Sequence, residues 1–238
     1  RTYQLVRRRP TASIVHAVQK VRQKIRFDQR FYSGSGFSHP PFILVFEICS
    51  RCNLRCKTCW FYGNAGSLNE VTDFGYEMNL EEIKRFIDNI APFKPYLLIT
   101  GGEPSLHKHF IETIDYASKK GLFKGVISNG TFLNESNAEK IVNAGLDFLT
   151  ISVDGTEETH NFIRGSNYSF KKTMEAIANI KKFRGKNALP IVTVNMTISD
   201  YNYFQLSDMA KIAEAVGVDI LQFQHQWFTE KEVAKAHT

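Results

Sequence analysis

From residue 42 onward, short β-rich runs alternate with segments that have helical spacing of apolar residues. Such alternation is typical of βαβ units, in which consecutive strands lie parallel and each crossover is right-handed. A closed barrel of this kind has eight strands, and six are expected here. The sequence therefore predicts an α/β fold, an open and partial (β/α)6 TIM-like barrel. Its expected strands are Ile43–Glu47, Tyr96–Thr100, Gly125–Ser128, Phe148–Val153, Ile191–Thr197 and Asp219–Phe223.

Capping residues mark two of the five helices expected between these strands. Asn79 and Glu82 stand as N-cap and N3 of a helix whose apolar face carries Ile83 and Ile87. Ser136 and Glu139 have the spacing of a second capping box, for a helix that closes at Gly145.

The net charge of +6 is concentrated at the start of the chain. Residues 1–30 contain nine Lys or Arg and one acidic residue, whereas residues 31–238 contain 21 basic and 23 acidic residues. We therefore divide the chain into a basic helical extension with its linker, residues 1–41, and a barrel domain, residues 42–238. The extension is expected to pack on the barrel or to bind an anionic partner: a leader peptide, a nucleic acid or a membrane surface. No apolar run is long enough to span a bilayer and no secretory signal is visible, so we expect no transmembrane segment and a cytoplasmic location.

All four cysteines lie within residues 49–59. Cys52, Cys56 and Cys59 form a CxxxCxxC motif after the first expected strand, and three thiolates this close can hold three corners of an iron–sulfur cubane. A four-thiolate zinc site that also uses Cys49 is the alternative. Cys49 is otherwise expected to be a core thiol.

Other polar motifs follow the next strands, where barrel active sites are assembled. They are Thr100-Gly101-Gly102-Glu103-Pro104, Ser128-Asn129-Gly130-Thr131, Ser152-Val153-Asp154-Gly155 and His160 to Gly165. In this order, after CxxxCxxC, they resemble the radical SAM superfamily over residues 42–225. The resemblance is to the branch with the molybdenum-cofactor, pyrroloquinoline-quinone and SPASM-type enzymes.

The resemblance implies a chemistry and its cofactors. A [4Fe–4S] cluster on Cys52, Cys56 and Cys59 would bind S-adenosylmethionine (SAM) at its open iron and cleave it reductively. The 5′-deoxyadenosyl radical would then abstract hydrogen from a peptide or a small biosynthetic substrate, as in a SPASM-like oxidoreductase or a peptide or cofactor maturase. Flavodoxin or ferredoxin would donate the electron. A non-catalytic iron–sulfur or zinc protein is the rival hypothesis.

The resemblance also implies roles for single residues. Gly101 and Gly102 would let the backbone approach the methionine moiety, Glu103 would accept from the SAM ammonium, and Pro104 would fix the turn. Further expected SAM contacts are Ser152 and Arg164 at the carboxylate, Asn129 near SAM or substrate, Asn195 at the ribose, and Phe223 or Gln224 at the adenine, with Asp154 near the substrate.

Two features depart from the family pattern or leave a choice open. Thr58 stands where an aromatic residue is common, and Trp60 or Phe61 is expected to supply the missing apolar cover. Cys59 is the last cysteine, whereas SPASM enzymes carry auxiliary clusters on cysteines beyond the barrel. Either such clusters are absent, or the sequence is a fragment whose C-terminal region is missing.

Overall fold

The computed structural model describes Val21 and residues 40–63, 75–185 and 189–226. The predicted basic helix within residues 1–41 lies almost wholly outside the described residues, so that division of the chain stays a prediction. Among the described residues, no helix combines the length and the hydropathy required to cross a membrane.

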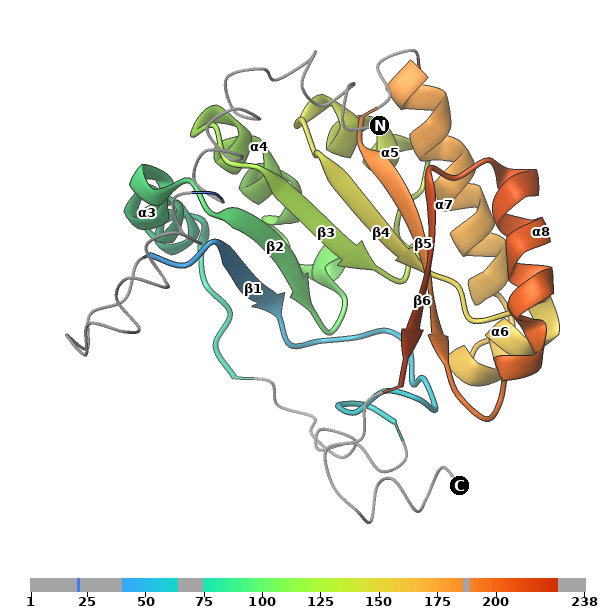
Figure 1. Ribbon diagram of the computed structural model, residues 1–238. Coiled ribbons are helices and arrows are strands. Elements are labelled where there is room, and N and C mark those ends of the chain that lie inside the picture. Colours follow the sequence, from blue (N-terminus) through green and yellow to red (C-terminus); the bar gives the residue numbers. More distant parts are fainter. Residues whose placement is uncertain (1–20, 22–39, 64–74, 186–188, 227–238) are drawn as a thin grey trace.

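Six strands form one parallel sheet in the order of the sequence (Figure 1). They are β1 (Ile43–Cys49), β2 (Tyr96–Gly101), β3 (Lys124–Ser128), β4 (Phe148–Ser152), β5 (Ile191–Ile198) and β6 (Ile220–His225). Every adjacent pair is parallel, with Glu47 opposite Thr100 and Ser152 opposite Asn195. The six predicted strands are confirmed, and β1 and β6 stay separate as the two edges of an open sheet.

Helices cover one face of this sheet (Figure 1). They are α3 (Leu80–Ile90), α4 (Phe110–Lys119), α5 (Glu135–Asn143), α6 (Glu157–Arg164), α7 (Ser169–Arg184) and α8 (Leu206–Val216), with the 3-10 turns η1 (Ala91–Phe93), η2 (Pro104–Leu106) and η4 (Tyr203–Gln205). The prediction of one helix between β4 and β5 is wrong, because α6 and α7 both lie there. Gly165, at φ 64°, ends α6 and separates the two.

The helix caps follow one prediction and correct another. The Asn79 side chain accepts from the backbone amides of Glu81 and Glu82, and the Glu82 side chain accepts from the Asn79 amide, as predicted. The cap of α5 is Asn134, not Ser136, because the Asn134 side chain accepts from the Asn137 amide at 2.9 Å. Helix α5 therefore begins at Glu135, one residue before Ser136.

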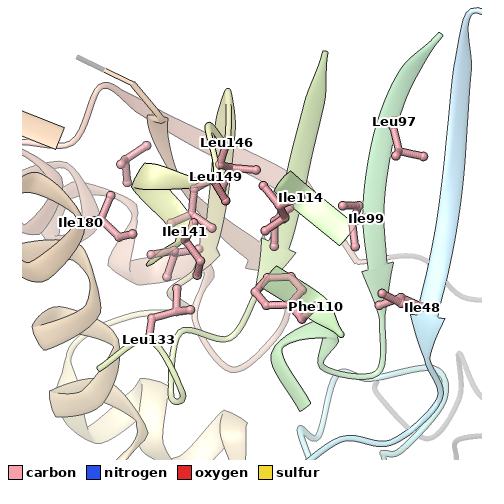
Figure 2. Close-up of a cluster of buried hydrophobic side chains, with 14 of the residues drawn as sticks. Ile48, Leu97, Ile99, Phe110, Ile114, Leu133, Ile141, Leu146, Leu149 and Ile180 are labelled. Atoms are coloured by element: carbon pink, nitrogen blue, oxygen red, sulfur yellow. The ribbon is translucent and has the colours of Figure 1, made fainter. Parts of the chain in front are cut away.

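The main core lies between the helices and the sheet (Figure 2). Ile83 and Ile87 of α3, Leu97 and Ile99 of β2 and Ile114 of α4 are fully buried there. At the amino ends of the strands, Lys124 at the start of β3 forms a buried ion pair with Asp147, which precedes β4 (2.7 Å). The core and this ion pair stabilise the sheet, and the polar motifs lie at its other end.

Candidate active site

The cysteine loop, residues 50–63, leaves the carboxyl end of β1 and turns back on itself. The Cys59 amide donates to the Cys56 carbonyl at 3.0 Å, and the Gly63 amide donates to the Cys59 carbonyl at 2.9 Å. A Cβ on Gly63 would lie 2.5 Å from that Cys59 oxygen, so the turn needs glycine. Cys52, Cys56 and Cys59 all line one cavity of about 560 Å³ at the carboxyl ends of the strands. The three predicted cluster cysteines thus line the same cavity, although among the described residues no three His, Cys, Asp or Glu side chains lie close enough together to hold a single metal ion.

Cys49 is excluded from this cavity and is buried, as expected of a core thiol. Its Sγ donates to Glu77 Oε1 at 3.2 Å, and Arg51 Nε donates to the same oxygen at 2.8 Å. Burial, and then the bond to Glu77, raise the pKa of Cys49 to about 11. Its position does not favour a four-thiolate zinc site.

The diglycine turn after β2 is docked onto the cysteine loop. The Gly102 amide donates to the Cys49 carbonyl and the Glu103 amide to the Arg51 carbonyl, each at 2.8 Å. A Cβ on Gly101 would lie 2.1 Å from the Cys49 oxygen, and one on Gly102 would lie 2.3 Å from the Arg51 oxygen. Both glycines also line the cavity. The missing side chains therefore admit the neighbouring backbone, a reason different from the expected approach of SAM.

Glu103 places a buried carboxylate in the cavity wall. Its Oε1 accepts from the amide and hydroxyl of Ser105 (3.1 and 2.5 Å) and from Ser128 Oγ (2.8 Å). Its Oε2 accepts from the Asn129 amide at 2.7 Å. Burial raises the pKa of Glu103, and the bonds from Ser105, Asn129 and Ser128 lower it in part. Oε2 keeps acceptor capacity for a cation in the cavity.

Asn129, after β3, also lines the cavity, but its side-chain amide is engaged by the protein. Its Nδ2 donates to Asn53 Oδ1 at 2.9 Å, and its Oδ1 accepts from the amide and hydroxyl of Thr131 at 2.9 and 2.6 Å. Asn53 Nδ2 completes the group by donating to Thr131 Oγ1 at 2.9 Å. Asn129 therefore ties the cysteine loop to the end of β3. The sequence reasoning missed Asn53, whose one signal was its place between two cluster cysteines.

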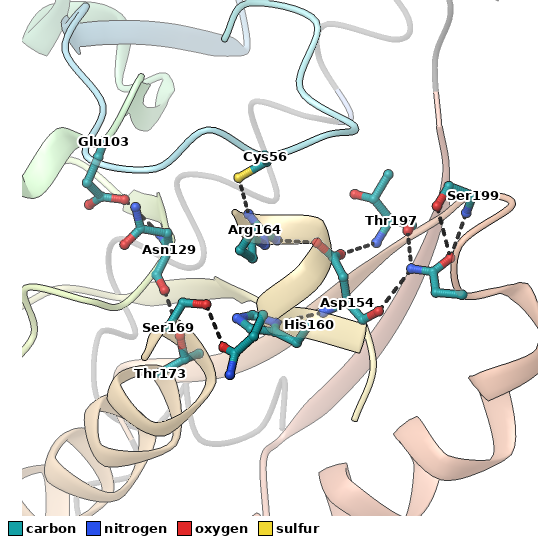
Figure 3. Close-up of polar contacts among 12 residues, drawn as sticks. Cys56, Glu103, Asn129, Asp154, His160, Arg164, Ser169, Thr173, Thr197 and Ser199 are labelled. Carbon is teal, nitrogen blue, oxygen red and sulfur yellow. Dashed lines mark hydrogen bonds and ion pairs between the residues drawn. The ribbon is translucent and has the colours of Figure 1, made fainter. Parts of the chain in front are cut away.

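Arg164, at the end of α6, connects the cysteine loop with the end of β4 (Figure 3). Its Nη2 lies 2.7 Å from Asp154 Oδ2, and its Nη1 donates to Cys56 Sγ at 3.6 Å. The other Asp154 oxygen accepts from the Thr197 amide at 3.0 Å. Burial alone would lower the pKa of Arg164, but Asp154 and Cys56 raise it above its usual value. Arg164, Asp154 and Ser152 all line the cavity, so its wall contains a guanidinium, a carboxylate and a hydroxyl.

His160 contacts the backbone of Asp154 and so helps to position the Asp154–Arg164 ion pair. Its Nδ1 accepts from the Asp154 amide at 3.1 Å, so the ring is neutral with its proton on Nε2. Burial, and then the positive charge of Arg164, lower the pKa of His160 to about 2.

Several predicted residues lie outside the cavity lining. Pro104 is buried at the start of η2. Asn195 shares the inner face of β5 with Thr197, which does line the cavity, but Asn195 lies nearer the start of the strand. Phe223 and Gln224 on β6 also lie outside the lining. By contrast Trp60 and Phe61 do line the cavity, beside Thr58, with their ring centroids 4.9 Å apart.

The donor set fits an iron–sulfur cluster with one open iron. Three thiols share a cavity, and thiolates are the ligands that such clusters prefer. The same cavity offers a carboxylate acceptor, a guanidinium and a hydroxyl, which suit the ammonium and carboxylate of an amino-acid group. The fold is an open α/β barrel, and three cysteines line the cavity at its carboxyl rim.

Comparison with known proteins gives the family. The Radical SAM superfamily profile matches residues 46–213. The chain belongs to this superfamily, whose members use a [4Fe–4S] cluster and SAM.

Curated relatives include Fe-coproporphyrin III synthase of Methanosarcina barkeri, which is 29% identical over 184 residues. That match covers 77% of this chain and 43% of the relative. The sporulation killing factor maturation protein SkfB of Bacillus subtilis is 29% identical over 191 residues, covering 80% of this chain and 44% of SkfB. The chain spans less than half the length of these relatives.

A solved structure of Streptococcus suis SuiB bound to S-adenosylmethionine has the same fold. Its TM-score is 0.67 at 13% sequence identity, and the match covers 80% of this chain and 42% of SuiB. The predicted partial barrel is thereby confirmed.

Proposed function

We propose that this chain is the SAM-cleaving barrel of an enzyme that modifies a peptide or a small biosynthetic molecule by hydrogen abstraction. One observation carries the proposal. The three free thiols share a cavity with groups of opposite charge, Glu103 on one wall and Arg164 on another. That pairing is complementary to a zwitterionic amino-acid group held beside a metal centre.

The residues of the cavity have separate tasks. Cys52, Cys56 and Cys59 would hold the cluster, which with SAM supplies one-electron cleavage of the sulfonium and a hydrogen-abstracting 5′-deoxyadenosyl radical. Glu103 accepts from the ammonium, and Arg164 donates to the carboxylate through N–H groups beyond those given to Asp154 and Cys56.

Ser152 adds a hydroxyl donor to the carboxylate from the end of β4. Trp60 and Phe61 exclude water from one side of the cavity. The assignments of Asn129 and Asn195 to SAM stay predictions, and for Asn129 we favour the positioning of the loop.

The relatives suggest two substrate classes. Some are named for haem or porphyrin synthesis and others for peptide maturation. We propose a substrate of the same kind, bound at the open side of the barrel, and a one-electron donor such as flavodoxin or ferredoxin.

The test is anaerobic reconstitution with iron and sulfide, followed by dithionite and SAM. We expect release of 5′-deoxyadenosine, and its loss in Cys52→Ala. Cys49→Ala is the matched control, since Cys49 lies outside the cavity. Cys49→Ala should keep both its iron and its SAM-cleaving activity.

The rival hypothesis, a non-catalytic site that also uses Cys49, makes the opposite prediction. There Cys49→Ala would lose its metal as Cys52→Ala does, and neither the wild type nor the control would release 5′-deoxyadenosine.

A further inference from the structure

A second hollow, the outer groove, lies behind the cysteine loop. Its volume is about 570 Å³, and its walls include Asn53 and Lys57 of the loop and Phe162 and Tyr168 from α6 and the turn after it. The Lys57 amide donates to the Ile163 carbonyl at 2.7 Å, which seals the loop against α6. The loop thus has two faces. Cys52 and Cys56 face the inner cavity, whereas Asn53 and Lys57 line the outer groove.

Asn53 and Lys57 are sequence neighbours of Cys52 and Cys56, so this segment of the cysteine loop lies between the groove and the proposed cluster. An electron that enters from the groove has to cross one segment of chain, and transfer rates fall steeply with distance. The inner cavity is the place of SAM and substrate in the proposed function, so a donor protein needs another approach. The outer groove provides one.

Exposed aromatic side chains border the groove. Phe162 and Tyr168 are 54% and 49% exposed. The Lys57 ammonium lies 4.5 Å from the centroid of the Phe162 ring. Aromatic side chains are enriched at protein interfaces.

The segments that line the groove carry mostly positive charge. Residues 51–63 and 157–172 contain six Lys or Arg and two acidic residues, Glu157 and Glu158, at the start of α6. Half of these cations are neutralised by ion pairs, Arg51 by Glu77, Arg164 by Asp154 and Lys172 by Glu175. In the part of the chain that the structure describes, Arg55, Lys57 and Lys171 form no ion pair, and the one charged residue in the groove lining is Lys57.

We propose that the outer groove docks a protein electron donor through an acidic face of that donor. This inference rests on the proposed function, because it requires a cluster on the inner side of the loop. The occupant follows from charge complementarity and from the position of the groove on the other side of the cysteine loop from the cysteines. A positive surface accelerates encounter with an acidic partner.

The test measures reduction of the reconstituted cluster by photoreduced flavodoxin in an anaerobic stopped-flow instrument. The variant is Lys57→Glu with Lys171→Glu, which reverses Lys57 of the groove lining and Lys171 of α7, three residues after Tyr168. Arg55 is left intact, since its Nη1 donates to the Cys52 and Leu54 carbonyls and shapes the loop. The matched control is Lys140→Glu, an exposed lysine on α5 that lines neither hollow.

At low salt we expect the double variant to accept electrons from flavodoxin about tenfold more slowly than the wild type, because steering is lost. The control should stay within about twofold of the wild type, and high salt should remove the difference. Dithionite is a small anion that needs no docking, so at high salt, where charge is screened, it should reduce all three proteins at one rate. The neutral variant Lys57→Gln should give a smaller slowing, in the same direction.

Equal rates with flavodoxin at low salt would overturn the docking surface. So would an equal slowing with dithionite, since the two lysines would then be shaping the site. A change in turnover at saturating dithionite would assign the groove to substrate instead and would also overturn it. Failure of the wild type to cleave SAM with dithionite would instead refute the proposed function itself, so the two failures are distinct.

Discussion

Adding one methyl group at Gly102 tests whether the diglycine turn serves the cysteine loop or the cofactor. In Gly102→Ala the new Cβ would lie 2.3 Å from the Arg51 oxygen, 2.7 Å from its carbonyl carbon and 3.0 Å from the Ser50 oxygen. All three are backbone atoms, so no rotamer change relieves the overlap. Because Gly102 does not have a positive φ, an alanine at this position adds no backbone strain.

The expected cost follows from this geometry. Ordinary contact begins near 3.4 Å, so the loop has to move away by about 1 Å. That movement weakens two backbone hydrogen bonds, from Gly102 and Glu103, each with a net contribution of about 1 kcal/mol. Overpacking of a close contact adds about 1–3 kcal/mol. We therefore expect Gly102→Ala to lower the free energy of unfolding by about 2–5 kcal/mol.

The assay is urea unfolding of the cluster-free chain, followed by iron content after reconstitution. Gly75→Ala is the control, because Gly75 has φ 66° and a Cβ added there would meet nothing within 4 Å. That variant carries backbone strain without overlap, at a cost of about 1 kcal/mol. The loop interpretation predicts the larger loss, together with poor retention of iron, for Gly102→Ala. It is refuted if Gly102→Ala is as stable as the control, retains its iron and has lost only SAM affinity.

Three further predictions concern buried polar groups. Unfolding stability should fall as pH drops below about 6.5, because the unfolded chain protonates His160 while the folded one, with its pKa lowered to about 2, does not. His160→Gln should remove about 1.4 kcal/mol of the change between about pH 7.5 and 5.5, and an unchanged pH profile would contradict this. Lys124→Met should cost about 3–5 kcal/mol in urea unfolding by removing the ammonium that faces the buried Asp147 carboxylate. Adding Asp147→Leu should recover most of that cost, and a milder effect of the single variant would argue against a strong ion pair. Asn53→Ala should cost about 1 kcal/mol and reduce retained iron by freeing the loop from Asn129, and full retention would count against the clamp.

The sheet and the rim could be predicted from the sequence because both depend on local patterns. The six β-rich runs needed no knowledge of their partners, and parallel order places their carboxyl ends together. The three thiols were likewise found from their spacing alone. The cap at Asn79 was found because both of its bonds are local, to Glu81 and Glu82.

The partners of the rim residues could not be predicted, since they are distant in sequence. Asn53 meets Asn129 across 76 positions, and Arg164 meets Cys56 across 108. Motif matching therefore indicated which residues lie near the cavity but not the protein partners of their side chains, such as Asn53 and Thr131 for Asn129. The same limit applies to Gly102, whose close neighbour is backbone from another strand end.

The anchors of the cysteine loop explain why so many motif residues contact protein. Residues 50–63 contain no helix or strand, so their shape depends on tertiary contacts. Three elements supply these: the diglycine turn after β2, Asn129 after β3, and the carboxyl end of α6, through Ile163 and Arg164. Each anchor is a contact between protein groups, so the fold itself helps to specify the shape of the loop. A loop held in this way keeps its three cysteines toward the inner cavity and Lys57 toward the outer groove.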